Sequence, residues 1–221
     1  MCIRDRTITG RVVFEGMAPP PDPSGMRIFL PPSGSGNSIR LDPSLGRGTV
    51  DAQGKFEFTG VTPGTFWPTY GSFAADKAGL WTVKKAVANG RDTLDAPLEI
   101  KPNEHLDWVL TFGDQATELG GTVSNASGRA ATDYFVIVFP ADKTLWTAHS
   151  RRVRTTRPAT DGKYSVKWLP AGDYLIAALI DVEQGEWNDP SFLARLVSSS
   201  IKVALAEGKT TTQDLRLAGG R

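Results

Sequence analysis

Two segments of the chain carry the same alternation of apolar and polar side chains. Residues 54–64 read GKFEFTGVTPG, and residues 162–172 read GKYSVKWLPAG. In each segment a glycine turn precedes a strand with an apolar residue at every second position, and a turn rich in Pro and Gly follows. This pattern is typical of a half-buried strand entering a hairpin. The chain is therefore predicted to contain two copies of one β domain.

The flanks of the two segments match as well. Residues 8–12 (ITGRV) open the first copy as residues 119–123 (LGGTV) open the second. Near the ends, residues 98–100 and 108–110 of the first copy match residues 201–203 and 215–217 of the second. Each copy is roughly 100 residues long, a common size for a self-sufficient fold. Solenoid repeats have periods of about 20 to 50 residues and share one core, so we predict two separate cores.

Strand signals dominate both copies, and turn-rich segments separate them. We predict domains at 1–113 and 117–221, joined by a short linker near residues 113–116. In the first copy, strands are expected near 7–14, 26–31, 55–59, 64–70, 80–88 and 105–112. In the second, they are expected near 117–124, 133–140, 162–167, 172–181, 200–205 and 211–217. Several short strands without alternating long helices predict an all-β fold of two tandem β-sandwiches. Pro68 interrupts one of these strands and leaves the register around it open.

One short helix is predicted near residues 189–197. Asp189 is a suitable N-cap residue, and Pro190 follows at the first helical position. Phe192, Leu193 and Leu196 can share one face of such a helix. We expect one or two helical turns to cover part of a sheet.

The composition of the chain argues against several classes of function. The chain has 221 residues, 40% hydrophobic and 22% charged, which suits a globular protein with two small cores. Its 25 basic and 24 acidic side chains nearly cancel, so nucleic acid or anionic lipid is not an expected partner. No run of about 18 apolar residues is present, so no transmembrane helix is expected in this stretch. The single cysteine does not reveal the redox compartment.

The first six residues do not read as part of the domain. Residues 1–6 (MCIRDR) lack the apolar region of a signal peptide, and a strand already begins near Ile8. The hexapeptide resembles translated sequencing-adapter sequence, so we expect it not to be native, Cys2 included. A genuine short leader is the alternative.

The openings at 8–12 and 119–123, together with the DGKY turn at 161–164 and the LPAGDY segment at 169–174, resemble the carboxypeptidase regulatory-like domain family. That family has a transthyretin-like, Ig-like Greek-key sandwich, also grouped with carbohydrate-binding-like folds. Residues 134–217 are similar to versions common in large acidobacterial extracytoplasmic proteins.

The resemblance implies a non-catalytic accessory module in the periplasm, at the outer membrane or outside the cell. It implies no catalytic residue, cofactor or metal. The expected partners are other domains of a parent protein of the peptidase or outer-membrane receptor type, for which the module would act as spacer, folding aid or interaction domain. A glycan is the alternative partner.

The residues themselves show no catalytic motif. A zinc carboxypeptidase needs closely spaced His and Glu ligands and a distant His, and the only histidines, His105 and His149, do not supply that spacing. Residues 33–36 (SGSG) lack the first glycine of a serine-hydrolase elbow. An enzyme would instead have to cluster polar groups in a deep pocket, with His149 near the acidic loop described next.

Two charged clusters remain as candidate binding sites. Asp181, Glu183, Glu186 and Asp189 crowd one loop and would offer oxygen ligands to Ca²⁺, although no calcium-loop pattern is present. The alternative is a solvated loop that caps the helix. A basic cluster would bind an anionic glycan or phosphate, or form ion pairs with the acidic loop. The basic cluster consists of Arg151, Arg152, Arg154 and Arg157.

Two tryptophans suggest the carbohydrate alternative. Trp146 and Trp187 lie in polar loop contexts, and exposed indole faces stack on sugar rings in many binding sandwiches. Core packing explains them equally well, so the carbohydrate reading predicts that both are exposed on one surface. Trp67, Trp81, Trp108 and Trp168 are expected to pack in or beside the cores, with Trp108 matching Leu215 of the second copy.

Overall fold

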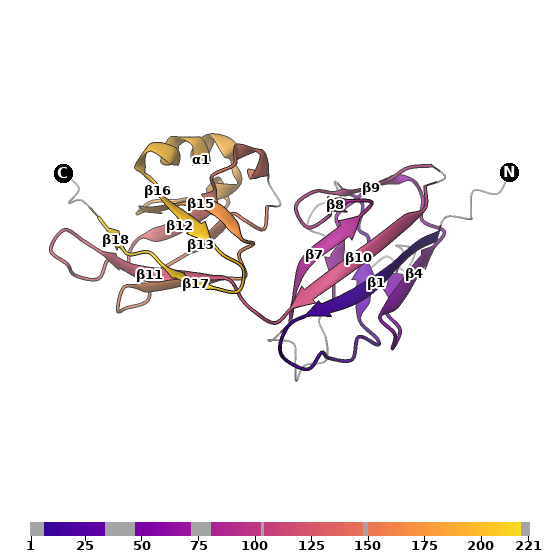
Figure 1. Cartoon of the computed structure of the whole chain (residues 1–221). Helices are drawn as coiled ribbons and strands as arrows, with labels where there is room; N and C mark the ends of the chain where they lie inside the picture. The colour runs from indigo at the N-terminus through magenta and orange to yellow at the C-terminus, as the bar shows by residue number, and fades with distance from the viewer. Residues whose placement is uncertain (1–6, 34–46, 72–80, 103, 148–149, 218–221) are drawn as a thin grey trace. The chain divides into compact units, whose positions relative to one another are not determined.

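The computed structural model describes residues 7–33, 47–71, 81–102, 104–147 and 150–217. The predictions about residues 1–6, Cys2 included, and about His149 lie outside these residues. The chain divides into two compact units, Met1–Asp114 (unit 1) and Gln115–Arg221 (unit 2) (Figure 1). Each unit is built of short strands, and the single α-helix belongs to unit 2 among the residues described. The all-β prediction with one short helix is confirmed.

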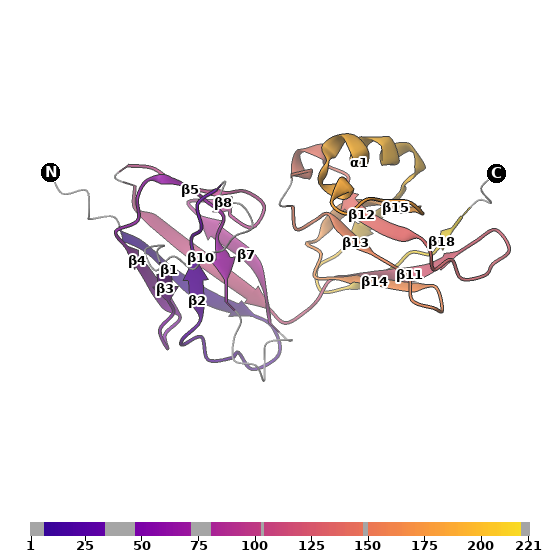
Figure 2. The ribbon, with the colours of Figure 1, turned by 180° about the vertical axis from the view of Figure 1, so that it is seen from behind.

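Unit 1 contains one large sheet and two small ones. The large sheet has the order β4-β1-β10-β7-β8, and the small sheets have the orders β3-β2-β6 and β5-β9 (Figure 2). The strands of the large sheet are β1 (Thr7–Glu15), β4 (Lys55–Thr59), β7 (Thr82–Ala88), β8 (Arg91–Asp92) and β10 (Leu106–Gly113). Those of the small sheets are β2 (Arg27–Phe29), β3 (Arg47–Thr49), β5 (Gly64–Phe66), β6 (Thr69–Tyr70) and β9 (Leu98–Ile100).

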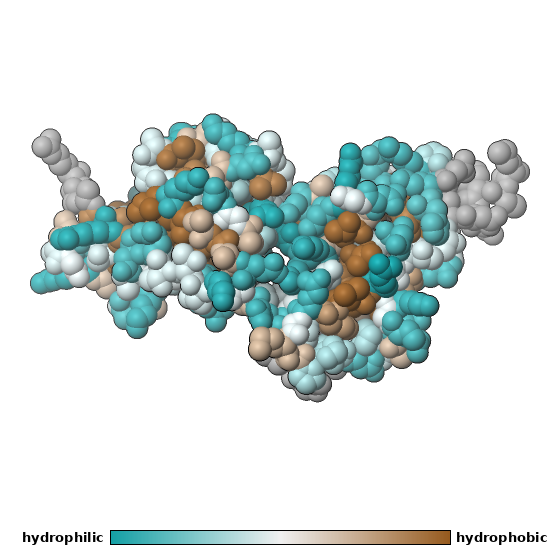
Figure 3. Space-filling view, viewed as in Figure 1, coloured by the Kyte–Doolittle hydropathy of each residue, from teal (hydrophilic) through white to brown (hydrophobic). Residues whose placement is uncertain are grey.

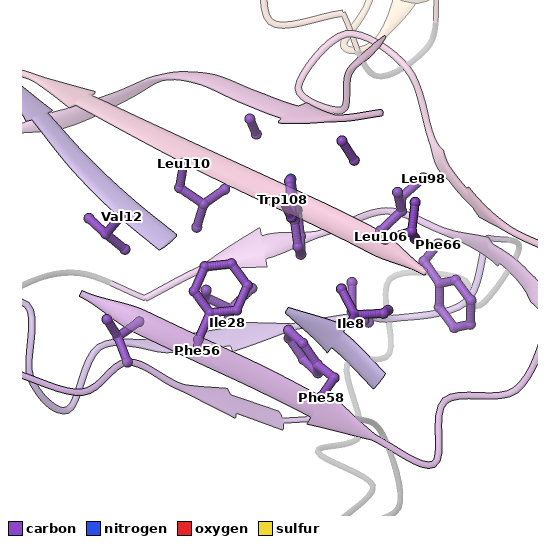
Figure 4. Close-up of a cluster of buried hydrophobic side chains, with 14 of the residues drawn as sticks. Ile8, Val12, Ile28, Phe56, Phe58, Phe66, Leu98, Leu106, Trp108 and Leu110 are labelled. Atoms are coloured by element: carbon purple, nitrogen blue, oxygen red, sulfur yellow. The ribbon is translucent and has the colours of Figure 1, made fainter. Parts of the chain in front are cut away.

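The core of unit 1 is centred on Trp108, whose side chain is 0% exposed. Alternate residues of β1, β4 and β10 point inward and meet residues of the small sheets, so the layers form a sandwich (Figure 4). Phe56 meets the Trp108 ring edge-on, with centroids 5.8 Å apart. Gly10 lies between these residues, and a Cβ there would clash with the Phe56 ring and with the Trp108 carbonyl. The glycine of the ITGRV opening therefore makes room for the Phe56 ring and for the backbone of β10 at Trp108.

Pro68 divides the strand that follows the first Pro/Gly turn. Residues 64–70 were expected to form one strand, but β5 pairs with β9 and β6 pairs with β2 on either side of Trp67 and Pro68. In unit 2 the corresponding strand stays whole and makes both pairings itself. Proline lacks the N–H that a central ladder requires, which accounts for the break.

Unit 2 is a sandwich of two sheets. The first has the order β14-β11-β17, with β18 also pairing with β11, and the second has the order β13-β12-β15-β16. The strands of the first sheet are β11 (Glu118–Ser124), β14 (Lys163–Lys167), β17 (Thr210–Thr212) and β18 (Leu215–Arg216). Those of the second are β12 (Phe135–Pro140), β13 (Arg154–Thr156), β15 (Gly172–Leu179) and β16 (Ile201–Leu205).

The second sheet of unit 2 is covered on both faces. Its inner face packs on the first sheet through residues such as Val138 and Ile176. Its outer face carries Ile137 and Phe139, which pack against Phe192 of α1 (Pro190–Leu196). This outer cluster explains why β12 and β15 read as nearly continuous apolar runs. The predicted helix is confirmed, with its apolar residues buried on the sheet.

The last strand predicted for unit 2 differs from the structure in its continuity and in its match to unit 1. Residues 211–217 were expected to form one strand, but it is broken at Gln213 and Asp214 because Asp214 accepts hydrogen bonds from the backbone N–H and the hydroxyl of Thr122. Leu215 lies opposite Val123, as Leu110 lies opposite Val12 in unit 1. Leu215 therefore takes the place of Leu110, and its predicted match with Trp108 is wrong.

Within the described residues, no helix combines the length and the apolar character needed to cross a membrane.

Candidate functional site

The register of the second sheet of unit 2 brings three loops to one end. Phe135, at the start of β12, lies opposite Leu179 at the end of β15. On the other side of β12, Val136 lies opposite Thr156 at the end of β13. The residues that precede β12 and those that follow β13 and β15 therefore lie at the same end of the sheet.

These loops surround an open depression with a volume of about 660 Å³. It contains three of the predicted acidic residues and one of the predicted arginines. Its lining consists of Asp133, Phe135, Arg157, Ile180, Asp181, Val182, Glu183 and Glu186. We call this feature the acidic depression.

Arg157 is held at the wall of the acidic depression by an aromatic ring. Its guanidinium carbon lies 4.1 Å from the centroid of the Phe135 ring. A cation over a ring face at an exposed site contributes about 0.5–1 kcal/mol. The contact leaves the arginine side chain exposed at the surface beside the carboxylates.

Carboxylates outnumber the single guanidinium among the lining residues, and one of them is tied to the helix. A terminal nitrogen of Arg195 lies 3.4 Å from Glu186 Oε1, and the other Glu186 oxygen accepts a 3.2 Å hydrogen bond from the Glu183 N–H. The excess of negative groups makes the depression more suitable for a cation than for an anionic glycan or phosphate.

The basic cluster is not one site. Arg152 Nη1 lies 3.3 Å from the Ala171 carbonyl oxygen and 3.3 Å from the Tyr174 hydroxyl, which itself donates a 2.7 Å hydrogen bond to Pro170. Arg152 thus braces the turn before β15. Arg151 is half-buried in the neighbouring turn, Arg154 is exposed on β13, and neither lines the acidic depression.

Trp146 is buried, as core packing predicts and contrary to what the carbohydrate alternative requires. Its side chain is 6% exposed and belongs to the outer core cluster, with its ring 5.7 Å from that of Phe139. The indole N–H donates a 2.7 Å hydrogen bond to the Pro140 carbonyl oxygen. The polar loop is short enough to fold back over the sheet, and burying a large indole with its N–H satisfied is favourable.

The position of Trp187 does not support the carbohydrate hypothesis either. It lies in a 3₁₀ turn, Glu186–Asn188, and is half-buried against the same outer cluster as Trp146. Unit 2 therefore does not present this pair as the exposed aromatic surface that sugar stacking requires. Both tryptophans instead help to hold α1 on the sheet.

Of the other four tryptophans, two lie in the core of unit 1 as expected and two are half-buried. Trp81 and Trp108 are buried, and Trp67 is half-buried between β5 and β6. Trp168 is half-buried but lies just after β14 with φ of 65°, not in a strand. In unit 1 the equivalent position is Gly60 with φ of 70°, where a glycine meets no steric penalty.

The carboxylates of the acidic loop do not come together as a group of three. Within the described part of the chain, no three His, Cys, Asp or Glu side chains lie close enough together to hold a metal ion. Asp189 instead caps α1, because its carboxylate accepts hydrogen bonds of 2.8 Å from the Ser191 N–H and 2.7 Å from the Ser191 hydroxyl. These two bonds, the hydroxyl first, lower the pKa of Asp189 below its ordinary value.

This cap predicts a pH-dependent contribution of Asp189 to the stability of unit 2. A lowered pKa in the folded state stabilises the protein above the ordinary pKa of 3.8, and this stabilisation is lost as the pH falls through the lower folded value. Asp189→Asn keeps an acceptor but removes the charge. The melting temperature of wild type should exceed that of D189N at neutral pH, and the gap should close in acid. A gap that is independent of pH would contradict the assignment.

Four residues of the acidic depression were not predicted: Asp133, Phe135, Ile180 and Val182. Asp133 precedes β12 and Phe135 begins it, whereas Ile180 directly follows β15 and is 49% exposed. A large apolar residue directly before an acidic loop was the available signal for Ile180. Asp133 and Phe135 could be placed only with the pairing register of β12.

His105 is exposed in unit 1, whereas the acidic depression belongs to unit 2. The enzyme alternative placed His149 near the acidic loop, and that residue lies outside the described part of the chain.

No family model and no curated protein matches the chain. Solved structures of bacterial pilins are similar over almost its whole length. The minor pilin GBS52 of Streptococcus agalactiae is 12% identical, with 98% of this chain and 97% of that chain covered and a TM-score of 0.41. A double mutant of the shaft pilin SpaA from Lactobacillus rhamnosus GG is 8% identical, with coverages of 99% and 98% and a TM-score of 0.34. A streptococcal ancillary pilin is 12% identical, with coverages of 97% and 69% and a TM-score of 0.36. At these values the likeness identifies neither a family nor a function.

Proposed function

We propose that the chain is a non-catalytic β-sandwich module of a larger bacterial extracytoplasmic protein, where it serves as a spacer or as a protein-interaction segment. The observation that carries the proposal is that each unit has its own core. Trp108 and Leu110 anchor one core, and Val138 and Ile176 anchor the other. Two self-contained sandwiches in tandem suit a segment that holds a neighbouring domain away from its attachment.

The sequence resemblance to carboxypeptidase regulatory-like domains supports the same role. Two of the segments that carry it, at 161–164 and 169–174, form the turns before β14 and before β15 of unit 2, and residues 54–64 form the matching turns of unit 1. Gly54 and Gly162 have φ of 77° and 81°, a conformation that favours glycine. The glycines of the motif are therefore needed for the turns of the fold, and the motif supplies no catalytic group. This fits an accessory domain.

The acidic depression gives the module one surface that would suit a partner. Carboxylates beside the exposed Ile180 are complementary to a partner segment that carries a basic and an apolar side chain. An extracytoplasmic location follows from the family resemblance and is part of this proposal.

Sequencing of the source DNA across both ends of this reading frame tests the proposal. A peptidase, a receptor or further sandwich repeats in the same frame is the expected result. A signal peptide directly before Ile8, together with a stop codon after Arg221, would describe a small stand-alone secreted protein and would overturn the module assignment.

A further inference from the structure

Strand β16 forms one edge of the second sheet of unit 2. Among the strands that the structure describes, it pairs with β15 alone, in a regular antiparallel register from Ile176 opposite Ile201 to Gly172 opposite Leu205. Among the described residues, no backbone hydrogen bond joins β16 to any element other than β15. An edge of this kind directs alternate N–H and C=O groups outward, where they are free to pair with another strand.

Strand β16 carries fewer charged side chains than two other edge strands of the same length. Edge strands β4 and β14 are equally long, but β4 exposes Lys55 and Glu57 and β14 exposes two lysines. Strand β16 has a single charged residue, Lys202, and its ammonium lies 3.0 Å from Asp173 Oδ2 of the neighbouring strand. Natural sheets use edge charges to prevent pairing, and β16 carries one such charge where β4 and β14 each carry two.

Apolar side chains reach the surface beside this edge. Ile201 is 40% exposed and Val197, in the 3₁₀ turn before β16, is 37% exposed. Figure 3 shows hydrophobic side chains along the course that β16 follows in Figure 1. Pairing with another strand would bury part of this surface.

The segment before the last strands of each unit forms a strand in unit 1 and a helix in unit 2. In unit 1 it contributes β7, which pairs with β10 and extends the large sheet. In unit 2 it contributes α1, which covers a sheet face and adds no strand. Among the described residues, the position that β7 takes beside β10 in unit 1 is therefore not filled by a strand beside β17 in unit 2; this edge belongs to the sheet that does not contain β16.

We propose that two copies of this chain associate by antiparallel pairing of their β16 strands about a two-fold axis at Val203. In this register Ile201 lies opposite Leu205 of the partner subunit, and Lys202 lies opposite Ala204 of the partner subunit. The strand is compatible with itself, since the pairing opposes no like charges. An interface of this kind is isologous and closes as a dimer. The inference goes beyond the proposed function, because the pairing of β16 needs no host domain.

Sedimentation equilibrium of the full 221-residue chain, from low to high micromolar concentration, tests this pairing. Ala204 is exposed, so its substitution leaves the core unchanged. Ala204→Lys opposes two lysines at each of two symmetric positions, and Ala204→Glu opposes a carboxylate and a lysine there. Relative to wild type, A204K should weaken the dimer and A204E should strengthen it, each by roughly two- to thirtyfold.

Thr210→Lys is the matched control, because it adds the same charge at an exposed position of β17, outside the proposed pairing. Its dimerisation should equal that of wild type, and thermal melting should show all three variants to be folded. A wild-type chain that stays monomeric at every concentration would refute the proposal. A dimer whose affinity shifts equally in A204K and A204E would place the interface elsewhere.

Discussion

Replacing Trp108 with alanine is expected to lower the free energy of unfolding of unit 1 by about 3–5 kcal/mol. The indole is 0% exposed and contacts Phe56, Phe58 and Tyr70 through ring centroids 5.8–6.4 Å apart. Its removal leaves a cavity that the surrounding strands can fill only in part. Urea denaturation of the full chain followed by far-UV circular dichroism measures the loss.

Trp108→Phe is the control for that experiment. The indole N–H of Trp108 is buried with no hydrogen-bond partner, so phenylalanine removes an unsatisfied donor and retains much of the ring volume. The cost of W108F should therefore be clearly smaller than that of W108A. Equal costs for the two variants would mean that the indole is not the centre of this core.

The second large effect is expected for Phe139→Ala in unit 2, again about 3–5 kcal/mol. Phe139 is 0% exposed on the outer face of β12, where it joins Trp146 and the apolar face of α1. The loss should appear in the unfolding of unit 2 and should reduce the protection of α1 in hydrogen exchange.

Phe135→Ala on the same face of β12 provides the comparison. Phe135 is only half-buried, beneath Arg157, so its removal opens no closed cavity and should cost much less. If F135A and F139A were equally destabilising, the outer cluster would not be a second core of unit 2.

The alternation of apolar and polar residues along the chain predicted most strands. In β4 and β14, for example, every second residue is buried. The alternation missed β3, β8, β9 and β13, which have two or three residues each. Of these, β3 and β13 lie in stretches rich in glycine or arginine. Such strands are set by pairing with β2 and β12, which are distant in sequence and not visible in local periodicity.

The candidate site was less predictable than the fold. The acidic loop and Arg157 could be proposed from charge alone, but their meeting depends on the register of three strands. Trp146 was misplaced for a related reason: a tryptophan within a polar loop has the same local sequence whether the loop extends outward or folds back over Phe139. Tertiary packing decides between these outcomes.

Native-state hydrogen exchange of W108A tests the central claim, that the chain consists of two self-contained sandwiches, most directly. Amides of the strands between Thr7 and Gly113 should lose protection, while those between Glu118 and Arg216 should keep the protection of wild type. Loss of protection in both sets of strands would show instead that the two units fold as one.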